Sequence, residues 1–193
     1  MIQELTIALR ALLLFSLLTG VIYPGAVTLL AQTLMPYQAN GSLLHSHGTL
    51  VGSELVGQSF HMPGYFHGRP SATALHPYNA AASGARNLGP LNPALAQAVR
   101  QELDSIRQAN PRQPQPPPAD LLTASASGLD PHISPAAARW QIPRVAQARN
   151  MTEAAVAALV VQETEGRMFH ILGEPRVNVL RLNLALDRHE FGP

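Results

Sequence analysis

The residues best suited to chemistry lie together in one polar loop, from Thr123 to His132, with the sequence TASASGLDPH. In a hydrolase, Ser125 or Ser127 would be the nucleophile and His132 its general base. Members of such triads usually come from separate parts of a chain, and no GxSxG turn is present to expose a serine. The alternative is structural, because Asp and Ser side chains fix turns and cap helices. The loop pattern favours this structural interpretation.

A second chemical possibility is a metal site, because the chain contains 8 histidines. His45 and His47 form the tightest pair, but a zinc site also needs a third ligand and supporting hydrogen bonds. The remaining histidines show no helical or hairpin ligand spacing. We therefore expect exposed or hydrogen-bonded histidines, and no metal or cofactor bound by this chain.

The composition excludes several other classes of chemistry. All 13 cationic residues are arginine, so the chain has no Walker-type phosphate-binding lysine and no Schiff-base lysine. The absence of cysteine rules out thiolate zinc sites and cysteine nucleophiles. The net charge is +1 and no arginine stripe is apparent, so we expect no nucleic-acid binding.

One long segment has the composition of a membrane helix. No formal charge occurs between Arg10 and Glu54, and residues 11–35 are almost wholly apolar. About 20 apolar residues in a helix cross a bilayer, whereas a signal peptide has an apolar core of only about 7–15 residues. We therefore predict a retained transmembrane helix at 11–35, preceded by a tail at 1–10 and followed by a connector at 36–47.

The predicted transmembrane helix is interrupted by Gly20, Pro24 and Gly25. Lipid-embedded helices tolerate such residues where Ser or Thr side chains or neighbouring helices satisfy the freed backbone groups, and small residues let another helix approach closely. A tolerated kink and a packed helix interface both remain open. The N-terminal amine and Arg10, offset in part by Glu4, favour a cytoplasmic N-terminus and an exported domain.

Residues 48–193 are predicted to form one soluble α+β domain, so the fold class is a single N-terminal transmembrane helix followed by several helices and short strands with long ordered loops. The Gly- and Pro-rich block up to Pro93 indicates short extended pieces joined by turns. Asn92 as N-cap and Pro93 at the first helical position predict a helix that ends at Asn110. Residues 111–118 are Pro-rich and predict a polyproline II connector.

The second half of the domain shows further helix signals. Ser134 with Pro135 predicts a short helix through about Gln141, and Pro143 opens another to about Arg149. The remaining predictions are a helix from Glu153 to about Glu165 capped by Thr152, a strand at 167–173, and a final segment, 176–187, that favours helix over strand.

The long loops are expected to bind something, since loops of this length are otherwise disordered and their aromatic and Gly content argues against disorder. Arg69 follows Tyr65 and Phe66, and could anchor a protein interface or stack on those aromatic rings. Both readings remain open. The candidate partner-interface residues are Gly20, Tyr23, Pro24, Gly25, Tyr65, Phe66, Arg69, Asn79, Asn87, Ser127, Asp130, His132 and Arg144.

These loops carry a family resemblance. GSELVGQSF, YFHGRPSA, YNAAASGARNLGPLNP, DLLTASASGLDPHISPAAA, RVAQAR and GEPRVNVLRLN resemble, in the same order, the C subunit of the bacterial Kdp-type potassium-transporting ATPase. The resemblance covers nearly the whole chain. Ala126 stands where the family usually has Gly, and Ala85 with Arg86 replaces a small Gly-Ser pair.

The resemblance implies a non-catalytic subunit of a potassium pump in the bacterial inner membrane. Its expected partners are a P-type ATP-hydrolysing subunit, a channel-like potassium-binding subunit and a small single-span subunit. ATP, magnesium and potassium act at the level of the complex, and the C subunit is proposed to be a catalytic chaperone that raises ATP affinity. Two alternatives from other classes are a membrane-tethered periplasmic hydrolase and a tethered binding module.

Overall fold

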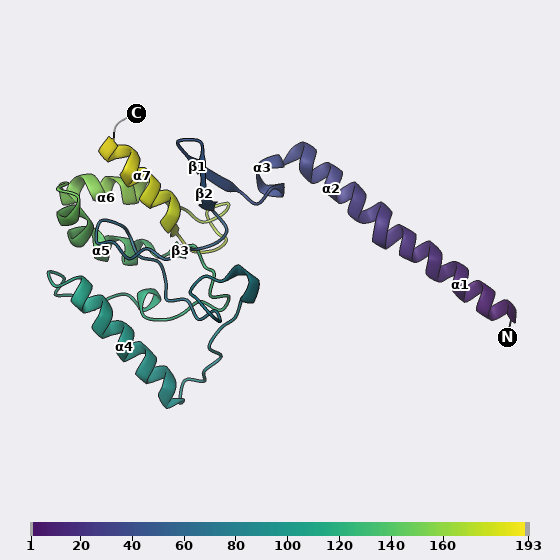
Figure 1. The fold of residues 1–193 in the computed structure, drawn as a ribbon, viewed down its shortest axis with the longest axis horizontal. Coiled ribbons are helices and arrows are strands. Elements are labelled where there is room, and N and C mark those ends of the chain that lie inside the picture. Colours follow the sequence, from purple (N-terminus) through teal and green to yellow (C-terminus); the bar gives the residue numbers. More distant parts are fainter. Residues whose placement is uncertain (1, 192–193) are drawn as a thin grey trace. The chain divides into compact units, whose positions relative to one another are not determined.

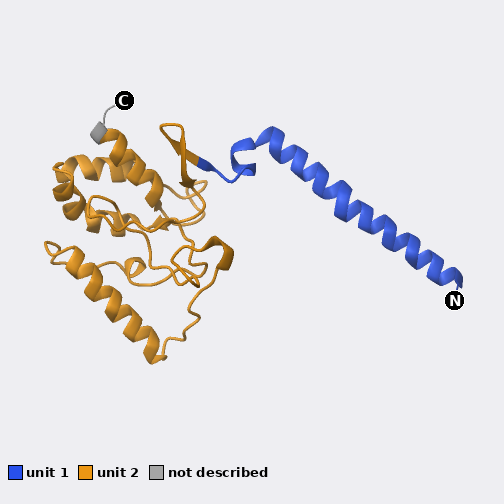
Figure 2. Cartoon of the chain, in the orientation of Figure 1, with its two compact units in different colours: residues 1–43 blue, residues 44–193 orange. Residues whose placement is uncertain are grey.

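The computed structural model describes residues 2–191, and the side chains of residues 2–189. The chain divides into two compact units, residues 1–43 and 44–193, coloured blue and orange in Figure 2. Figure 1 labels the main elements. The α-helices and β-strands are α1 (Ile2–Leu17), α2 (Tyr23–Leu34), α3 (Pro36–Ala39), β1 (Leu43–Ser46), β2 (Thr49–Ser53), α4 (Pro93–Ala109), β3 (His132–Ile133), α5 (Pro135–Ala148), α6 (Glu153–Gln162), β4 (Thr164–Glu165), β5 (Arg176–Asn178) and α7 (Val179–Phe191).

The first unit is dominated by one apolar helix, Ile2–Leu34, which is long and apolar enough to span a membrane. We call it the anchor helix. It combines α1 and α2 through a π-helical turn, Leu18–Ile22. Pro24 lacks the N–H that would bond to the carbonyl of Gly20, and the preceding Tyr23 N–H donates instead to Leu18 O, five residues back. The interruption predicted from the sequence is therefore a π-turn within a continuous helix.

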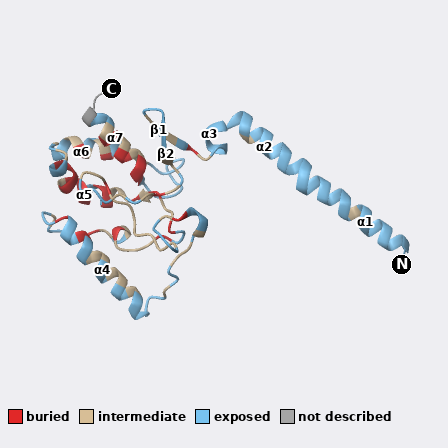
Figure 3. Ribbon diagram, in the orientation of Figure 1, coloured by how far each residue is buried: buried red, intermediate tan, exposed pale blue. Residues whose placement is uncertain are grey.

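The surface of the anchor helix needs an apolar surrounding. None of its residues is buried, and nearly all are exposed, as the mostly pale blue ribbon in Figure 3 shows. Its threonine hydroxyls bond within the helix: Thr19 Oγ1 donates to Phe15 O at 2.7 Å, and Thr33 Oγ1 donates to Leu29 O at 2.9 Å. These bonds satisfy the hydroxyls without water, as a lipid environment requires.

The predicted connector, 36–47, contains regular structure. It holds the short helix α3 and the strand β1, which pairs with β2 in a two-stranded sheet. The hairpin turn is formed by His47 (φ 48°) and Gly48 (φ 78°). Positive φ at both turn residues matches the twist of a tight hairpin, so His47 is a turn residue.

The second unit is built around a small antiparallel sheet with strand order β3-β5-β4. Val177 of the central strand faces Ile133 on one side and Thr164 on the other. It has no exposed surface. Helices α5, α6 and α7 pack with this sheet, and Figure 3 shows that burial is concentrated there. The core side chains without exposed surface include Val145, Val156, Leu182 and Leu186.

The fold class is confirmed, as is the helix at 93–109, where Asn92 Oδ1 accepts from Ala94 N at 2.9 Å. The predicted break at Pro143 is wrong, because α5 runs unbroken through it. A proline inside a helix costs about 3 kcal/mol. Burial of Trp140, Ile142 and Val145 on the same helix offsets that cost.

Two neighbouring predictions also need correction. The helix capped by Thr152 ends at Gln162, and Thr164–Glu165 is strand β4, because these residues pair with β5. The segment 167–173 is a turn and not a strand. Phe169 and His170 have positive φ, and Met168 and Leu172 exchange backbone hydrogen bonds of 2.9 Å. The final segment is helical from Val179, as favoured, after the short strand β5.

Candidate functional site

Two long loops of the second unit meet at an ion pair. Arg69 Nη1 donates to Asp130 Oδ2 at 3.1 Å, and Arg69 Nη2 donates to Thr123 O at 3.4 Å. The hydroxyl of Tyr78 donates to Arg69 O at 2.6 Å. Burial, followed by the charge of Asp130, raises the pKa of Tyr78 to about 12, so this hydroxyl keeps its proton. The loop around Arg69 is thereby fixed to the loop that contains Asp130.

Asp130 also organises its own loop. Its Oδ1 accepts from His132 N at 3.0 Å and lies 3.5 Å from His132 Nδ1. Burial alone would raise the pKa of Asp130, but hydrogen bonds from His132 and then from Arg69 outweigh it and hold this pKa below its usual range. The carboxylate therefore remains ionised. Arg69, Asp130 and His132 together line a surface depression of about 400 Å³.

Further hydrogen bonds join the same two loops. Ser71 Oγ donates to Gly128 O at 2.7 Å, and Gly84 N donates to Ser127 O at 3.0 Å. At Gly128 the backbone has φ +69°, and a Cβ there would lie 2.6 Å from Thr73 Cγ2. Only glycine fits this contact without strain. We call the set Arg69, Ser71, Ser127, Asp130 and His132 the loop joint.

The serines of the loop joint region have structural bonds. Ser125 Oγ accepts from Gly128 N at 2.9 Å, and Ser127 Oγ accepts from Leu129 N at 3.1 Å. In residues 2–189 no hydrogen bond connects either serine with His132, whose ring faces Asp130. This geometry supports the structural interpretation over the hydrolase. The same part of the chain contains no group of three or more His, Cys, Asp or Glu side chains that could hold a metal ion.

Beneath the loop joint, two side-chain amides hold the backbone of Phe66 and His67. Asn183 Oδ1 accepts from Phe66 N at 2.8 Å, and its Nδ2 donates to Phe66 O at 3.0 Å. Gln141 bonds His67 in the same way, at 2.9 and 3.1 Å. Each amide replaces a strand neighbour. Both are nearly fully buried in helices, and sequence reasoning missed them, although an amide within an apolar helix is a usable signal.

Three of the predicted interface residues, Phe66, Asn79 and Arg144, are buried inside the domain. Phe66 has no exposed surface, and Arg144 is 8% exposed. The Arg144 guanidinium donates to Asn110 Oδ1, Pro63 O, Tyr65 O and Gln141 Oε1. Burial lowers the pKa of Arg144 to about 10, which leaves it charged at neutral pH. All three side chains were expected at a partner surface, but their burial makes them internal supports.

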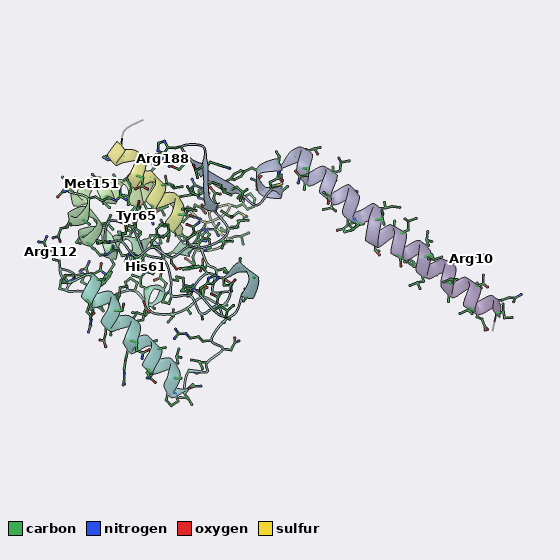
Figure 4. The ribbon with its side chains drawn as sticks, in the orientation of Figure 1. Arg10, His61, Tyr65, Arg112, Met151 and Arg188 are labelled. Atoms are coloured by element: carbon green, nitrogen blue, oxygen red, sulfur yellow. The ribbon has the colours of Figure 1, made fainter. Side chains whose placement is uncertain are left out.

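The aromatic ring beside the loop joint has a different cationic partner from the expected one. Arg149 lies over the ring of Tyr65, 4.7 Å from its centroid, and Tyr65 Oη donates to Asp187 Oδ2 at 3.2 Å. Arg149 Nη2 also donates to Asp187 Oδ1 at 2.7 Å. Tyr65 is labelled in Figure 4. Arg69 pairs with the carboxylate of Asp130, and the cation over the ring of Tyr65 is Arg149.

Asn79 and the remaining predicted interface residues are distributed over both units. Asn79 is buried, and its side chain accepts from Ala81 N at 3.1 Å. Asn87 is exposed, with φ 49°. Gly20, Tyr23, Pro24 and Gly25 are exposed on the anchor helix, and a Cβ at either glycine would meet no atom within 4 Å. The anchor residues and the loop joint thus form separate candidate surfaces.

Comparisons with known proteins identify the relatives of this chain. The family model described as "KdpC: K+-transporting ATPase, c chain" matches residues 5–188. A potassium-transporting ATPase KdpC subunit of Methylococcus capsulatus is 57% identical over 187 residues, which cover 97% of this chain and 98% of that protein. Proteins with the same description from Herpetosiphon aurantiacus and Burkholderia orbicola are 58% and 59% identical, covering 94% and 88% of each chain.

The match includes both the anchor helix and the loop joint, and it extends over nearly all of each relative. An identity of 57% over this length is far above the level at which a family is recognised. The chain therefore belongs to the KdpC family, the c chains of K+-transporting ATPases.

Proposed function

We propose that this chain is a non-catalytic subunit of a high-affinity, ATP-driven potassium import pump and is needed for the assembly and stability of that complex. The observation that carries the proposal is the family membership, since the relatives are named potassium-transporting ATPase KdpC subunits. Its partners would be a P-type ATP-hydrolysing subunit, a channel-like potassium-binding subunit and a small single-span subunit. ATP, magnesium and potassium would act in those subunits.

The contacts of the loop joint support a role without catalysis. Arg69 and Asp130 pair with each other, and the hydroxyls of Ser125 and Ser127 accept backbone hydrogen bonds. These groups fix loop shape and so present a rigid surface. We expect the purified chain to hydrolyse neither ATP nor ester substrates. Hydrolysis that Ser127→Ala abolishes would favour the tethered hydrolase instead.

The proposed location is the bacterial inner membrane, crossed once, with a cytoplasmic N-terminus and a periplasmic domain. The anchor helix and the small positive bias at Arg10 support this orientation. Because the chain contains no cysteine, single-cysteine variants report its topology directly. A membrane-impermeant maleimide should label Leu91→Cys in intact spheroplasts, because Leu91 is 96% exposed, but label Ile2→Cys only after permeabilisation. The reverse pattern would contradict the orientation.

The proposed action on the complex is that of a catalytic chaperone that raises the ATP affinity of the hydrolysing subunit. A periplasmic domain would act across the membrane, through the anchor helix or through the channel-like subunit. Allosteric coupling of this kind is typically about 1–3 kcal/mol and reciprocal for binding. We expect a non-hydrolysable ATP analogue to bind the complete complex at least about fivefold more tightly than a complex lacking this chain. Equal affinities would contradict the chaperone role and leave the subunit role intact.

A further inference from the structure

A cavity of about 440 Å³ lies between helix α5 and the loop that follows α4. Its walls include Pro63, Asn110 and Pro111 on one side and Trp140 and Arg144 on the other. Sites for small molecules usually have volumes of about 300–1,000 Å³, with mostly apolar walls and a few fixed polar groups. This cavity has both properties, and it is separate from the loop joint.

The cavity carries positive charge. Arg112 and Arg144 both line it, and none of the lining residues among the described side chains, residues 2–189, is acidic. Arg112, labelled in Figure 4, is exposed on the loop after α4. Arg144 donates to four neutral oxygens. Two are the backbone carbonyls of Pro63 and Tyr65, and two are the side-chain amide oxygens of Asn110 and Gln141. A buried cation normally has an anionic partner.

The C-terminal end of α4 is the only opposing charge at the cavity that we identify among the described residues. A helix C-terminus carries about half a negative charge on its free carbonyls. Asn110 reduces this effect, because its N–H donates to Arg107 O at 3.1 Å and its Nδ2 donates to Ile106 O at 2.8 Å. Two full positive charges therefore outweigh the helix end, and the cavity attracts anions.

The apolar walls indicate the rest of the ligand. Trp140 is held in place, because its Nε1 donates to Gln115 O at 3.0 Å, and Gln113 Nε2 donates to Trp140 O at 2.8 Å. Pro111 and Pro143 line the cavity beside it. Indole and proline rings form flat, rigid surfaces that suit a planar apolar group. Because the indole N–H and four of the five Arg144 N–H groups are already bonded, recognition would depend mainly on charge and shape.

We propose that this cavity binds a small organic carboxylate with a flat apolar body, its carboxylate beside Arg112 and Arg144 and its flat face near Trp140. The proposal is independent of the pump-subunit function, because it rests on the cavity alone. The chain has 1 tryptophan, and that residue lines the cavity, so intrinsic fluorescence reports on binding there.

The test uses the full chain purified in a neutral detergent, with 4-nitrobenzoate as the probe and 4-nitrobenzamide as its neutral match. Both compounds quench tryptophan fluorescence. N-acetyltryptophanamide in the same detergent provides the correction for light absorption by the probe and for collisional quenching. We expect 4-nitrobenzoate to quench Trp140 saturably, with a midpoint about tenfold lower than that of the amide at low salt, and a smaller ratio in 0.5 M NaCl.

Variants assign the preference to the cavity. Arg112→Gln should reduce the ratio between the two probes to about threefold or less, and it should fold normally because Arg112 is exposed. Arg139→Gln is the matched control, an exposed arginine on α5 outside the cavity lining, and it should keep the wild-type ratio. Linear, non-saturable quenching by both probes would overturn the proposal. An unchanged ratio in Arg112→Gln, or an equal loss in Arg139→Gln, would overturn it as well.

Discussion

The guanidinium of Arg69 lies 3.1 Å from the carboxylate of Asp130, across 61 residues of sequence, and each side chain is about one quarter exposed. The pair joins the two loops that carry most of the sequence motifs of this chain. Such a pair fixes loop geometry because each partner has further bonds: Arg69 to Thr123 O, and Asp130 to His132 N. The loop joint thus holds the two loops in a fixed arrangement, and we expect its loss to lower the stability of the second unit.

Replacing Arg69 by Gln should destabilise the second unit by about 1–2 kcal/mol, because a partly exposed charged hydrogen bond is lost. The matched control is Arg167→Gln, which breaks the exposed pair of Arg167 with Glu174 at 2.9 Å. Exposed pairs are worth about 0–1 kcal/mol, so the control should change stability little. Urea unfolding of the full chain in detergent measures both. Equal effects of the two variants would contradict a structural role for the loop joint.

The stability of the chain should fall as pH decreases from about 6.5 to about 4 because of His67. Burial, followed by the charge of Arg144, lowers the pKa of His67 to about 4 in the folded chain. The unfolded state, with a His pKa of about 6.5, then binds more protons in this window. His67→Gln should remove this part of the pH dependence, measured by unfolding at a series of pH values. His61→Gln is the control, and a slope that disappears in His61→Gln instead would contradict the assignment.

Asp130 should also make stability fall as pH decreases, but in a lower pH window than His67. Its pKa is held below the usual range in the folded chain, so its contribution is complete above the unfolded value of about 3.9 and is lost as pH falls below that value. Asp130→Asn should therefore lower stability at pH 7 and flatten the curve below pH 4. The free energy of unfolding, measured between pH 2.5 and 7 for the variant and the wild type, tests this effect. Parallel curves of this free energy against pH would contradict it.

Asn183→Leu should cost about 2–4 kcal/mol, because it leaves the buried N–H and C=O of Phe66 without their partners. Gln101→Leu, an amide-to-Leu change at an exposed position of α4, is the control and should be nearly neutral. Thermal or urea unfolding compares the two. A neutral Asn183→Leu would show that the amide does not support the segment beneath the loop joint.

Several elements could be predicted because their signals are local. Asn92, Pro93 and Asn110 mark both ends of α4, and the apolar run marks the anchor helix. Long-range contacts gave no such signal. Gln141 and Asn183 act on a segment more than 70 residues away, and burial of Trp140 with Val145 keeps α5 continuous through Pro143.

The error at 167–173 has a different cause. Its apolar residues suggested a strand, yet Phe169 and Ile171 are 78% and 75% exposed at the end of a turn. Hydrophobicity alone does not distinguish a buried strand from an exposed turn when the segment is short. The candidate interface showed the same limit: the motif residues were identified, but only the structure separates exposed Asn87 from buried Phe66.

The anchor helix should contribute to assembly through its open glycine face. Gly25→Leu fills space in which a Cβ meets no atom within 4 Å, so it should insert normally yet block the close approach of another helix. We expect reduced co-purification of the partner subunits, measured against Val21→Leu as a control of similar size on the same helix. Unchanged co-purification would favour the alternative, in which the helix tolerates its interruption and Gly25 forms no helix interface.

The most direct test of the central claim is purification through a C-terminal tag from detergent-solubilised membranes, followed by a potassium-stimulated ATPase assay. A P-type ATPase and a channel-like protein should co-purify in a fixed ratio, and activity should be lost when the anchor helix is replaced by a generic transmembrane helix. If the chain purifies alone and the pump runs without it, the chain is not a working part of the potassium pump.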